Sequence, residues 1–380
     1  MKVICFSLMP YRPLDLKAAR EHRSTWVVLP NSFYDPEKGA AEYESYIDML
    51  AYAEDLGFDG IGVNEHHQTG YGLMPAPNLI ASALIQRTKR VKIAILGRAL
   101  PLVSNPLYIA EELSMLDNLS RGRLVCGFVR GIGAEYHASG VNPAFSHDRF
   151  HEAHDLIIKA WTDPGPFSWE GEQYNFNYVN MWPRIYQKPH PPIWIPSQGS
   201  QETIDWAADP SRRYPFMITF APRDAVVKNL TAYRDKAREY GYEPTSSQFG
   251  WAAPVYVADT LERAMAEARE GIETMFNDFL RMPQRMLMPP GYTSLASMKR
   301  MLSTRAGLGF AHMTLETLME LGTVVVGTPQ MVRDRIDQMR EKTNLGIFIP
   351  LLQTGTLNNE MTRRNMELFA SDVMPHLQAS

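Results

Sequence analysis

Cysteine is scarce in this sequence: Cys5 and Cys126 are the only two among 380 residues, and each lies inside an apolar run. Thiols in such surroundings are typically reduced and buried, so we expect neither a disulfide framework nor a cysteine-based metal site. Basic runs are also missing, because no stretch of Lys or Arg exceeds two residues and the formal net charge is −4. This charge pattern argues against nucleic acid and against a membrane surface as partners.

Targeting segments and nucleotide fingerprints are lacking as well. Residues 1–30 interrupt short apolar runs with charged side chains, which fits neither a signal peptide nor a membrane-spanning helix. We therefore expect a cytoplasmic protein. No Gly-x-Gly-x-x-Gly pattern follows any apolar run, so direct binding of NAD(P)H is not predicted. The expected partner is a small molecule or another protein.

Short apolar runs alternate with segments of helical periodicity almost from end to end, which is typical of a parallel α/β protein. The eight runs expected to form strands are Val3–Leu8, Gly60–Asn64, Lys92–Leu100, Leu124–Val129, Ile193–Pro196, Phe216–Phe220, Trp251–Ala258 and Ile347–Leu352. The expected helices lie at about 40–56, 76–88, 106–119, 147–161, 200–208, 223–240, 260–276, 329–343 and 359–376. This alternation fits a (β/α)8 TIM barrel with insertions better than a six-stranded doubly wound sheet. We therefore expect one TIM-barrel domain over residues 1–380.

Two stretches are longer than the loops of a barrel require. Residues 162–192 are rich in Pro and aromatic side chains, and Tyr174–Tyr178 is expected to form an exposed hairpin. Residues 277–323 are rich in Met, whose flexible side chain adapts to irregular apolar surfaces. Because this stretch precedes the last strand, we expect it at the catalytic end as an active-site lid. A helical subdomain with a Met-rich core is the alternative.

Polar residues follow the second expected strand, where Gly60–Val63 runs directly into Asn64-Glu65-His66-His67. Ligands and catalytic groups gather at the carboxyl ends of parallel strands. Successive strand residues point to opposite faces, so His66 and His67 cannot both enter one pocket. A hydrogen-bonded pair of loop histidines is the simpler alternative for this motif.

An anion site is expected where Ser197-Gln198-Gly199-Ser200 joins a strand to a helix. Unpaired backbone N–H groups and small hydroxyl side chains at such a turn favour a phosphate, and Thr203 adds a hydroxyl one turn on. Arg130, at the end of another strand, is the expected cation because its guanidinium binds phosphate through two N–H groups. An ordinary N-cap at Ser200 and a surface salt bridge at Arg130 are the alternatives.

Further motifs follow one another in chain order. They are Asn64-Glu65-His66-His67, Asn105-Pro106, Glu111-Glu112-Leu113, Leu116-Asp117, Leu119-Ser120-Arg121-Gly122-Arg123, Arg130-Gly131, Pro191–Ser197 and Ser200–Ala208, with a weaker match at Gly327-Thr328-Pro329. In this series the chain resembles the bacterial luciferase-like flavin monooxygenases. Each motif alone is weak, but the ordered set over about residues 1–220 is specific.

The resemblance implies which residues form the site. His66 matches the family's catalytic histidine beside the flavin C4a position. The residues that match the family's flavin-binding positions are Arg130, Ile132, Gly199, Ser200 and Thr203 around the phosphate, Arg149 as a second phosphate-facing arginine, and Ala81-Ser82, where relatives carry a non-proline cis peptide under the ring. The luciferases proper carry a reactive Cys where this chain has Val129, so the resemblance implies flavin binding but not bioluminescence.

The implied function is that of an FMN-dependent two-component monooxygenase. A separate NAD(P)H:flavin reductase supplies reduced FMN, which reacts with O2 to a flavin C4a-peroxide, and one oxygen atom enters a small, apolar organic substrate. The type of oxygenation stays open, and relatives are commonly homodimers or homotetramers. A deazaflavin-dependent hydride-transfer oxidoreductase and a non-catalytic flavin-binding subunit are the alternatives. A metal-dependent hydrolase is disfavoured, and no metal is expected, because adjacent strand residues cannot converge on one ion.

Overall fold

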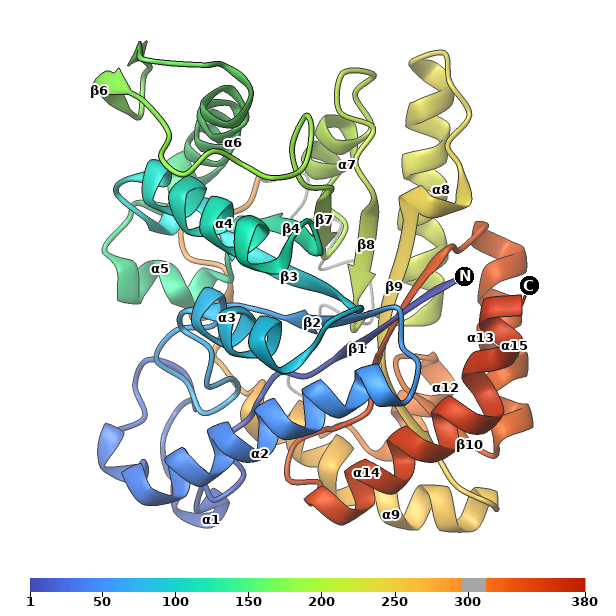
Figure 1. The fold of residues 1–380 in the computed structure, drawn as a ribbon. Helices are drawn as coiled ribbons and strands as arrows, with labels where there is room; N and C mark the ends of the chain where they lie inside the picture. The colour runs from blue at the N-terminus through green and yellow to red at the C-terminus, as the bar shows by residue number, and fades with distance from the viewer. Residues whose placement is uncertain (295–311, 380) are drawn as a thin grey trace.

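Parallel strands close into a barrel, and helices surround it on the outside (Figure 1). This computed structural model describes residues 1–294 and 312–379. The barrel strands are β1 (Lys2–Phe6), β2 (Gly60–Val63), β3 (Lys92–Ala99), β4 (Leu124–Val129), β7 (Ile193–Ser197), β8 (Phe216–Thr219), β9 (Phe249–Val257) and β11 (Ile347–Leu351). They follow chain order around the ring, and β9 closes it by pairing with both β8 and β11. The prediction of a (β/α)8 TIM barrel is therefore confirmed.

The outer layer consists of the helices that connect the strands and of two helices that follow the last strand, α14 (Asn359–Leu368) and α15 (Met374–Ala379). The connecting helices are α2 (Pro36–Asp55), α3 (Pro77–Arg87), α4 (Pro106–Ser120), α6 (Ser146–Thr162), α7 (Gln201–Ala207), α8 (Arg223–Glu239), α9 (Leu261–Thr274) and α13 (Pro329–Thr343). Asp35 caps α2 by accepting from the N–H groups of Glu37 and Lys38, so this helix begins at Pro36, before the expected residue 40. Across the described parts of the chain, no helix has the length and apolarity needed to cross a membrane.

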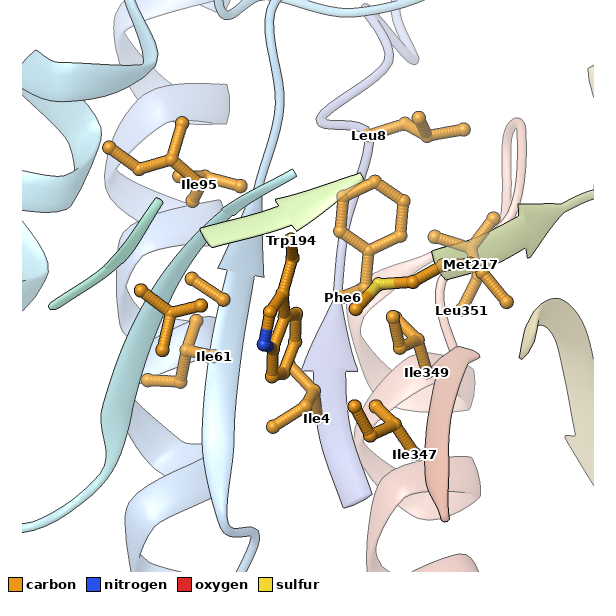
Figure 2. Packing of buried hydrophobic residues seen from close by; sticks show 14 of the residues in the cluster. Ile4, Phe6, Leu8, Ile61, Ile95, Trp194, Met217, Ile347, Ile349 and Leu351 are labelled. Carbon is orange, nitrogen blue, oxygen red and sulfur yellow. The ribbon is translucent and has the colours of Figure 1, made fainter. Parts of the chain in front are cut away.

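Apolar side chains fill the inside of the barrel (Figure 2). The indole of Trp194 from β7 lies in the centre, beside Ile4 and Phe6 of β1, and Met217 and Ile349 approach from β8 and β11. All five side chains are buried. Aromatic and branched side chains of this size leave no channel through the barrel, so ligands are confined to the ends of the strands.

Three features depart from the sequence expectations. A short extra strand, β10 (Val325–Gly327), pairs with the last part of β9 outside the barrel ring. Tyr174–Tyr178 does not form a hairpin by itself as expected: Tyr174 is buried, and the residues after it lie in one strand, β6 (Asn175–Val179), which pairs antiparallel with β5 (Phe167–Glu170). The short helices α1 (Leu16–Ala19), α5 (Gly133–Ser139), α10 (Gln284–Leu287) and α12 (Leu315–Leu321) were not predicted, because one or two helical turns carry little periodicity.

The Met-rich stretch at 277–323 is described on both sides of residues 295–311, which lie outside the described residues. Its first part packs against the loop that follows β1. Trp26 donates through Nε1 to the carbonyl of Phe279 at 2.7 Å, and Thr25 donates to the same carbonyl at 3.0 Å. Arg20 forms an ion pair of 2.7 Å with Asp278. The beginning of this stretch, at Asp278 and Phe279, is therefore held against the barrel.

Candidate active site

His66 lies just beyond the end of β2, enclosed by aromatic rings. Its ring meets Trp26 edge-on at a centroid distance of 5.2 Å and Tyr71 at 5.0 Å. Its Nδ1 atom lies 3.0 Å from Oε1 of Glu135, and its side chain is 11% exposed. No hydrogen bond to Nε2 is formed by the residues that the structure describes. One imidazole nitrogen is thus held by the protein, and the other can meet a ligand.

Glu135, in the first turn of α5, fixes the orientation of His66. The side chain is 1% exposed, and its second oxygen accepts the backbone N–H of Ile132, the residue before α5, at 2.7 Å. A carboxylate only accepts hydrogen bonds, so the proton of a neutral imidazole sits on Nδ1, and Nε2 keeps its lone pair. The sequence analysis missed Glu135, because the residue three positions before it, Ile132, has no capping side chain that would have marked a helix start.

Glu65 and His67 form a hydrogen-bonded network of their own beside that of His66 and Glu135. His67 Nε2 lies 2.7 Å from Glu65 Oε1, while Arg98 and the N–H of Ala99 bind the other oxygen of Glu65 at 2.5 and 3.0 Å. Burial favours a raised pKa for Glu65, but the bonds from His67 and Arg98 outweigh it and hold the pKa below its usual value. The bond to Glu65 raises the pKa of His67. This network ties the end of β2 to β3, whereas Glu135 orients His66.

The turn between β7 and α7 has the expected arrangement of hydroxyl groups. Ser197 Oγ accepts the N–H of Gly199 at 3.0 Å, and Ser200 Oγ accepts the N–H of Thr203 at 3.3 Å and lies 2.8 Å from its Oγ1. Gly199 has a φ of +89°, and a Cβ there would lie 2.1 Å from Asn229 Nδ2, so only glycine fits. Ser200 is thus an N-cap, as the alternative stated, and the turn brings Gly199, Ser200 and Thr203 together.

Arg130 leaves the end of β4 and contacts the Met-rich stretch. Its NH1 group donates to Ser146 Oγ at 3.0 Å and to the carbonyl of Tyr292 at 3.1 Å, and its guanidinium lies 4.6 Å from the centre of the Tyr292 ring. Two residues farther, Ser294 donates to Glu202 at 3.0 Å, in the first turn of α7. The same short segment therefore contacts Arg130 and the helix that Ser200 begins. No sequence signal singled out Tyr292.

Arg149 is not brought together with Arg130 by any contact in the described parts of the chain. Its Nε donates to the carbonyl of Pro101 at 3.0 Å, its NH2 donates to the carbonyl of Val103 at 2.7 Å, and the guanidinium lies 4.9 Å from the centre of the Tyr174 ring. These bonds tie α6 to the loop after β3. Arg149 therefore has a structural role in this contact, in addition to the phosphate-facing role that the resemblance implies.

The position of the non-proline cis peptide is corrected by the structure. Ala81 and Ser82 lie in the middle of α3, and the cis bond is Leu96-Gly97 in β3. The register between β3 and β4 shifts between Ile95 and Arg98, at the same place. Residues 77–87 form a continuous outer helix, so Ala81-Ser82 does not provide a strand end beneath a ring, and the pair is not retained as part of the site.

Residues 1–294 and 312–379 contain no group of three His, Cys, Asp or Glu side chains close enough together to hold a metal ion. Cys5 and Cys126 are both buried and free. Burial raises the pKa of the Cys5 thiol to about 12, so this group is protonated and inert. Polar groups at the carboxyl ends of the strands include those around His66, Arg130 and Ser200.

Comparison with known proteins shows the family. The sequence model of the luciferase-like monooxygenase family matches residues 23–344. The alkanal monooxygenase alpha chain of Photobacterium leiognathi is 26% identical over 340 residues, covering 88% of this chain and 93% of that protein.

Two solved structures share the whole fold. One is the oxygenating constituent of 3,6-diketocamphane monooxygenase from Pseudomonas putida in complex with FMN, with a TM-score of 0.74, 20% identity and coverage of 99% of this chain and 98% of that one. An F420-dependent secondary alcohol dehydrogenase has a TM-score of 0.65 and 16% identity and covers 87% and 94% of the two chains. The chain belongs to the luciferase-like monooxygenase family and is a flavin-dependent monooxygenase.

Proposed function

We propose that the protein is a two-component monooxygenase that uses reduced FMN and O2 to oxygenate a small, apolar organic substrate. The observation that carries the proposal is the joint position of three groups at the carboxyl ends of parallel strands. His66 with Glu135 follows β2, Arg130 follows β4, and the Ser200 turn follows β7. Proton transfer and phosphate binding are thereby available at one end of the barrel.

The residues around Arg130 fit a flavin phosphate. Arg130 supplies a planar cation, the Gly199–Ser200 turn supplies backbone N–H groups, and Ser200 and Thr203 supply hydroxyls. Ile132, which begins α5 beside Arg130, lines the same region. Reduced FMN, when bound there, supplies the electrons for oxygen activation.

The chain contributes proton transfer and a dry environment. His66 Nε2 accepts or donates a proton where the reaction needs one, since its Nδ1 is held by Glu135. Trp26 and Tyr71 shield the imidazole from water. A separate NAD(P)H:flavin reductase delivers the reduced flavin, in keeping with the missing dinucleotide fingerprint. We further propose a cytoplasmic homodimer or homotetramer, with residues 277–323 acting as the lid.

Oxygen uptake tests the proposal. The protein is mixed with chemically reduced FMN in aerated buffer containing a panel of aldehydes, cyclic ketones, aromatics and sulfur compounds, and products are read by mass with labelled dioxygen. We expect one added oxygen atom in the product and an equal, substrate-dependent fall in the hydrogen peroxide formed per O2 consumed, and His66→Gln should bind FMN yet release peroxide instead of product. Turnover with reduced deazaflavin but not with reduced FMN would establish the hydride-transfer alternative. Flavin binding without either reaction would establish a non-catalytic subunit.

A further inference from the structure

Two buried side-chain amides at the carboxyl ends of strands have oxygens without partners. Asn64 follows β2 and is 6% exposed, and Gln353 follows β11 and is 1% exposed. Neither Asn64 Oδ1 nor Gln353 Oε1 receives a hydrogen bond from the described residues. Gln353 Nε2 donates to the carbonyl of Gly355 at 2.9 Å, so the amide is oriented and its oxygen faces the other way.

Both amides follow strands that flank β1. β1 pairs with β2 on one side and with β11 on the other, so that Phe6 lies opposite both Gly62 and Leu351. A Cβ on Gly62 would lie 3.1 Å from the Phe6 ring, and Figure 2 shows Phe6 and Leu351 among the side chains inside the barrel. Asn64 and Gln353 follow Gly62 and Leu351 by two residues each, just past the ends of β2 and β11. They therefore border the layer above Phe6.

His66 follows Asn64 after one residue, beyond the end of the same strand. Its free Nε2 belongs to the ring that Trp26 and Tyr71 enclose. The two unpaired oxygens and the imidazole thus follow strands that meet at the apolar layer containing Phe6. A buried acceptor without a donor is unfavourable, and native proteins retain one where a water, an ion or a ligand supplies the donor.

We propose that Asn64 and Gln353 accept hydrogen bonds from the ring N–H groups of the reduced flavin. This inference rests on the proposed function, because it assumes a flavin ring above Phe6. The oxidised ring carries one N–H group, at position 3, and reduction adds another at position 5. Two acceptor oxygens therefore match the reduced ring better than the oxidised one, and they favour binding of the cofactor in the form in which it reacts.

Anaerobic binding of oxidised and of chemically reduced FMN tests this assignment. The parent protein should bind the reduced form more tightly. Asn64→Leu and Gln353→Met keep the side-chain size and remove the acceptor. The variant that loses the acceptor for position 5 should lower the ratio of the two affinities by about fivefold to tenfold, and the variant that loses the acceptor for position 3 should weaken both forms alike. Thermal unfolding without flavin should be unchanged or improved in Asn64→Leu, which removes an unpaired buried oxygen, whereas Gln353→Met also loses the bond to the Gly355 carbonyl and should be slightly less stable. The thermal unfolding measurement therefore distinguishes a loss of flavin binding from misfolding of the variant.

Thr362→Val is the matched control. Thr362 Oγ1 is also buried without a partner among the described residues, but it lies in α14 on the outside of the barrel. This variant should leave the affinity ratio unchanged. If both site variants keep the parental ratio and instead raise the KM of a substrate, the amides bind substrate and the inference is wrong, while the proposed function stands. If the parent binds neither form of FMN, the proposed function itself fails.

Discussion

His66 Nδ1 lies 3.0 Å from Oε1 of Glu135, although 69 residues separate the two along the chain. Glu135 is almost fully buried, and its other oxygen is held by the backbone of Ile132, so its position does not depend on His66. The contact joins the ends of β2 and β4 and sets the tautomer of the imidazole. Glu135 is thus a positioning residue for the proton chemistry at Nε2.

Glu135→Gln should disturb this tautomer without removing the side chain. The amide offers an N–H donor to Nδ1, which then accepts, and the proton moves to Nε2. We expect turnover to fall by about 10- to 100-fold, with reduced FMN bound within about twofold of the parent. Long-range ¹H–¹⁵N NMR of labelled histidine reports the tautomer directly, and the His66 signals are assigned from a His66→Gln sample.

His67→Gln is the control for that experiment. His67 bonds to Glu65 in a network of its own, so its loss should leave the His66 tautomer as it is. An unchanged tautomer in Glu135→Gln, together with a loss of FMN binding, would mean that Glu135 acts only through the fold.

Arg130→Lys should weaken the binding of FMN by about tenfold or more but leave riboflavin binding within about twofold. Lysine keeps the charge and loses both the planar pair of donors and the stacking on Tyr292. Fluorescence titration with the two flavins isolates the phosphate contribution. Arg149→Lys should change neither affinity by more than about twofold, because Arg149 binds the carbonyls of Pro101 and Val103. A selective loss of FMN binding in Arg149→Lys would restore this residue to the phosphate site.

The Glu65 and His67 pair should make stability depend on pH. The pKa of His67 is raised in the folded state. The contribution of His67 to the free energy of unfolding is therefore complete below the ordinary pKa of 6.5 and is lost as the pH rises through the folded pKa. The pKa of Glu65 is lowered, so its contribution is complete above 4.5 and is lost as the pH falls through the folded pKa. Both contributions are therefore complete between pH 4.5 and 6.5.

Urea unfolding of the parent and of His67→Gln checks this dependence. The parent should be more stable by about 1 kcal/mol at pH 6, and the difference should shrink toward pH 9. Groups that titrate identically in both proteins cancel in the difference. A difference that stays constant or grows with pH would show that the charged imidazole is not what Glu65 stabilises.

The barrel could be predicted because its signals are local. Strands such as Leu124–Val129 are buried almost throughout, so they read as apolar runs, and caps such as Thr328-Pro329 mark the helices. The strand Val325–Gly327 was not predicted, because three residues are too few to show a periodic pattern. Local patterns therefore determine the architecture but not the additions to it.

The site was only partly accessible from the sequence. His66 and Arg130 stand at strand ends that the sequence indicates, but the contact of His66 with Glu135 depends on how β2 and β4 meet in space. The cis bond was misplaced because matching motifs along the chain does not reveal the register shift in β3. Tyr292 reaches Arg130 across 162 residues, a contact that no pattern encodes.

The Met-rich stretch offers a test of the proposed lid. Leu287 and Pro289 rest on the first turn of α5, where a Cβ on Gly133 would lie 2.1 Å from the carbonyl oxygen of Leu287 and 2.5 Å from Pro289 Cδ. Alanine is a better helix former than glycine, so Gly133→Ala should keep α5 intact and push this segment away. Trypsin cleavage after the exposed Arg285 should then become about tenfold faster, with little change in global unfolding.

His137→Ala is the matched control for this substitution, because His137 is exposed on the same helix. It should leave the cleavage rate as in the parent protein. Displacing the segment also removes the Tyr292 contacts of Arg130, so Gly133→Ala should alter FMN affinity while riboflavin affinity changes less. Faster cleavage with parental affinity for both flavins would mean that the segment packs on α5 without covering the phosphate site, and residues 277–323 would then be a peripheral subdomain instead of a lid.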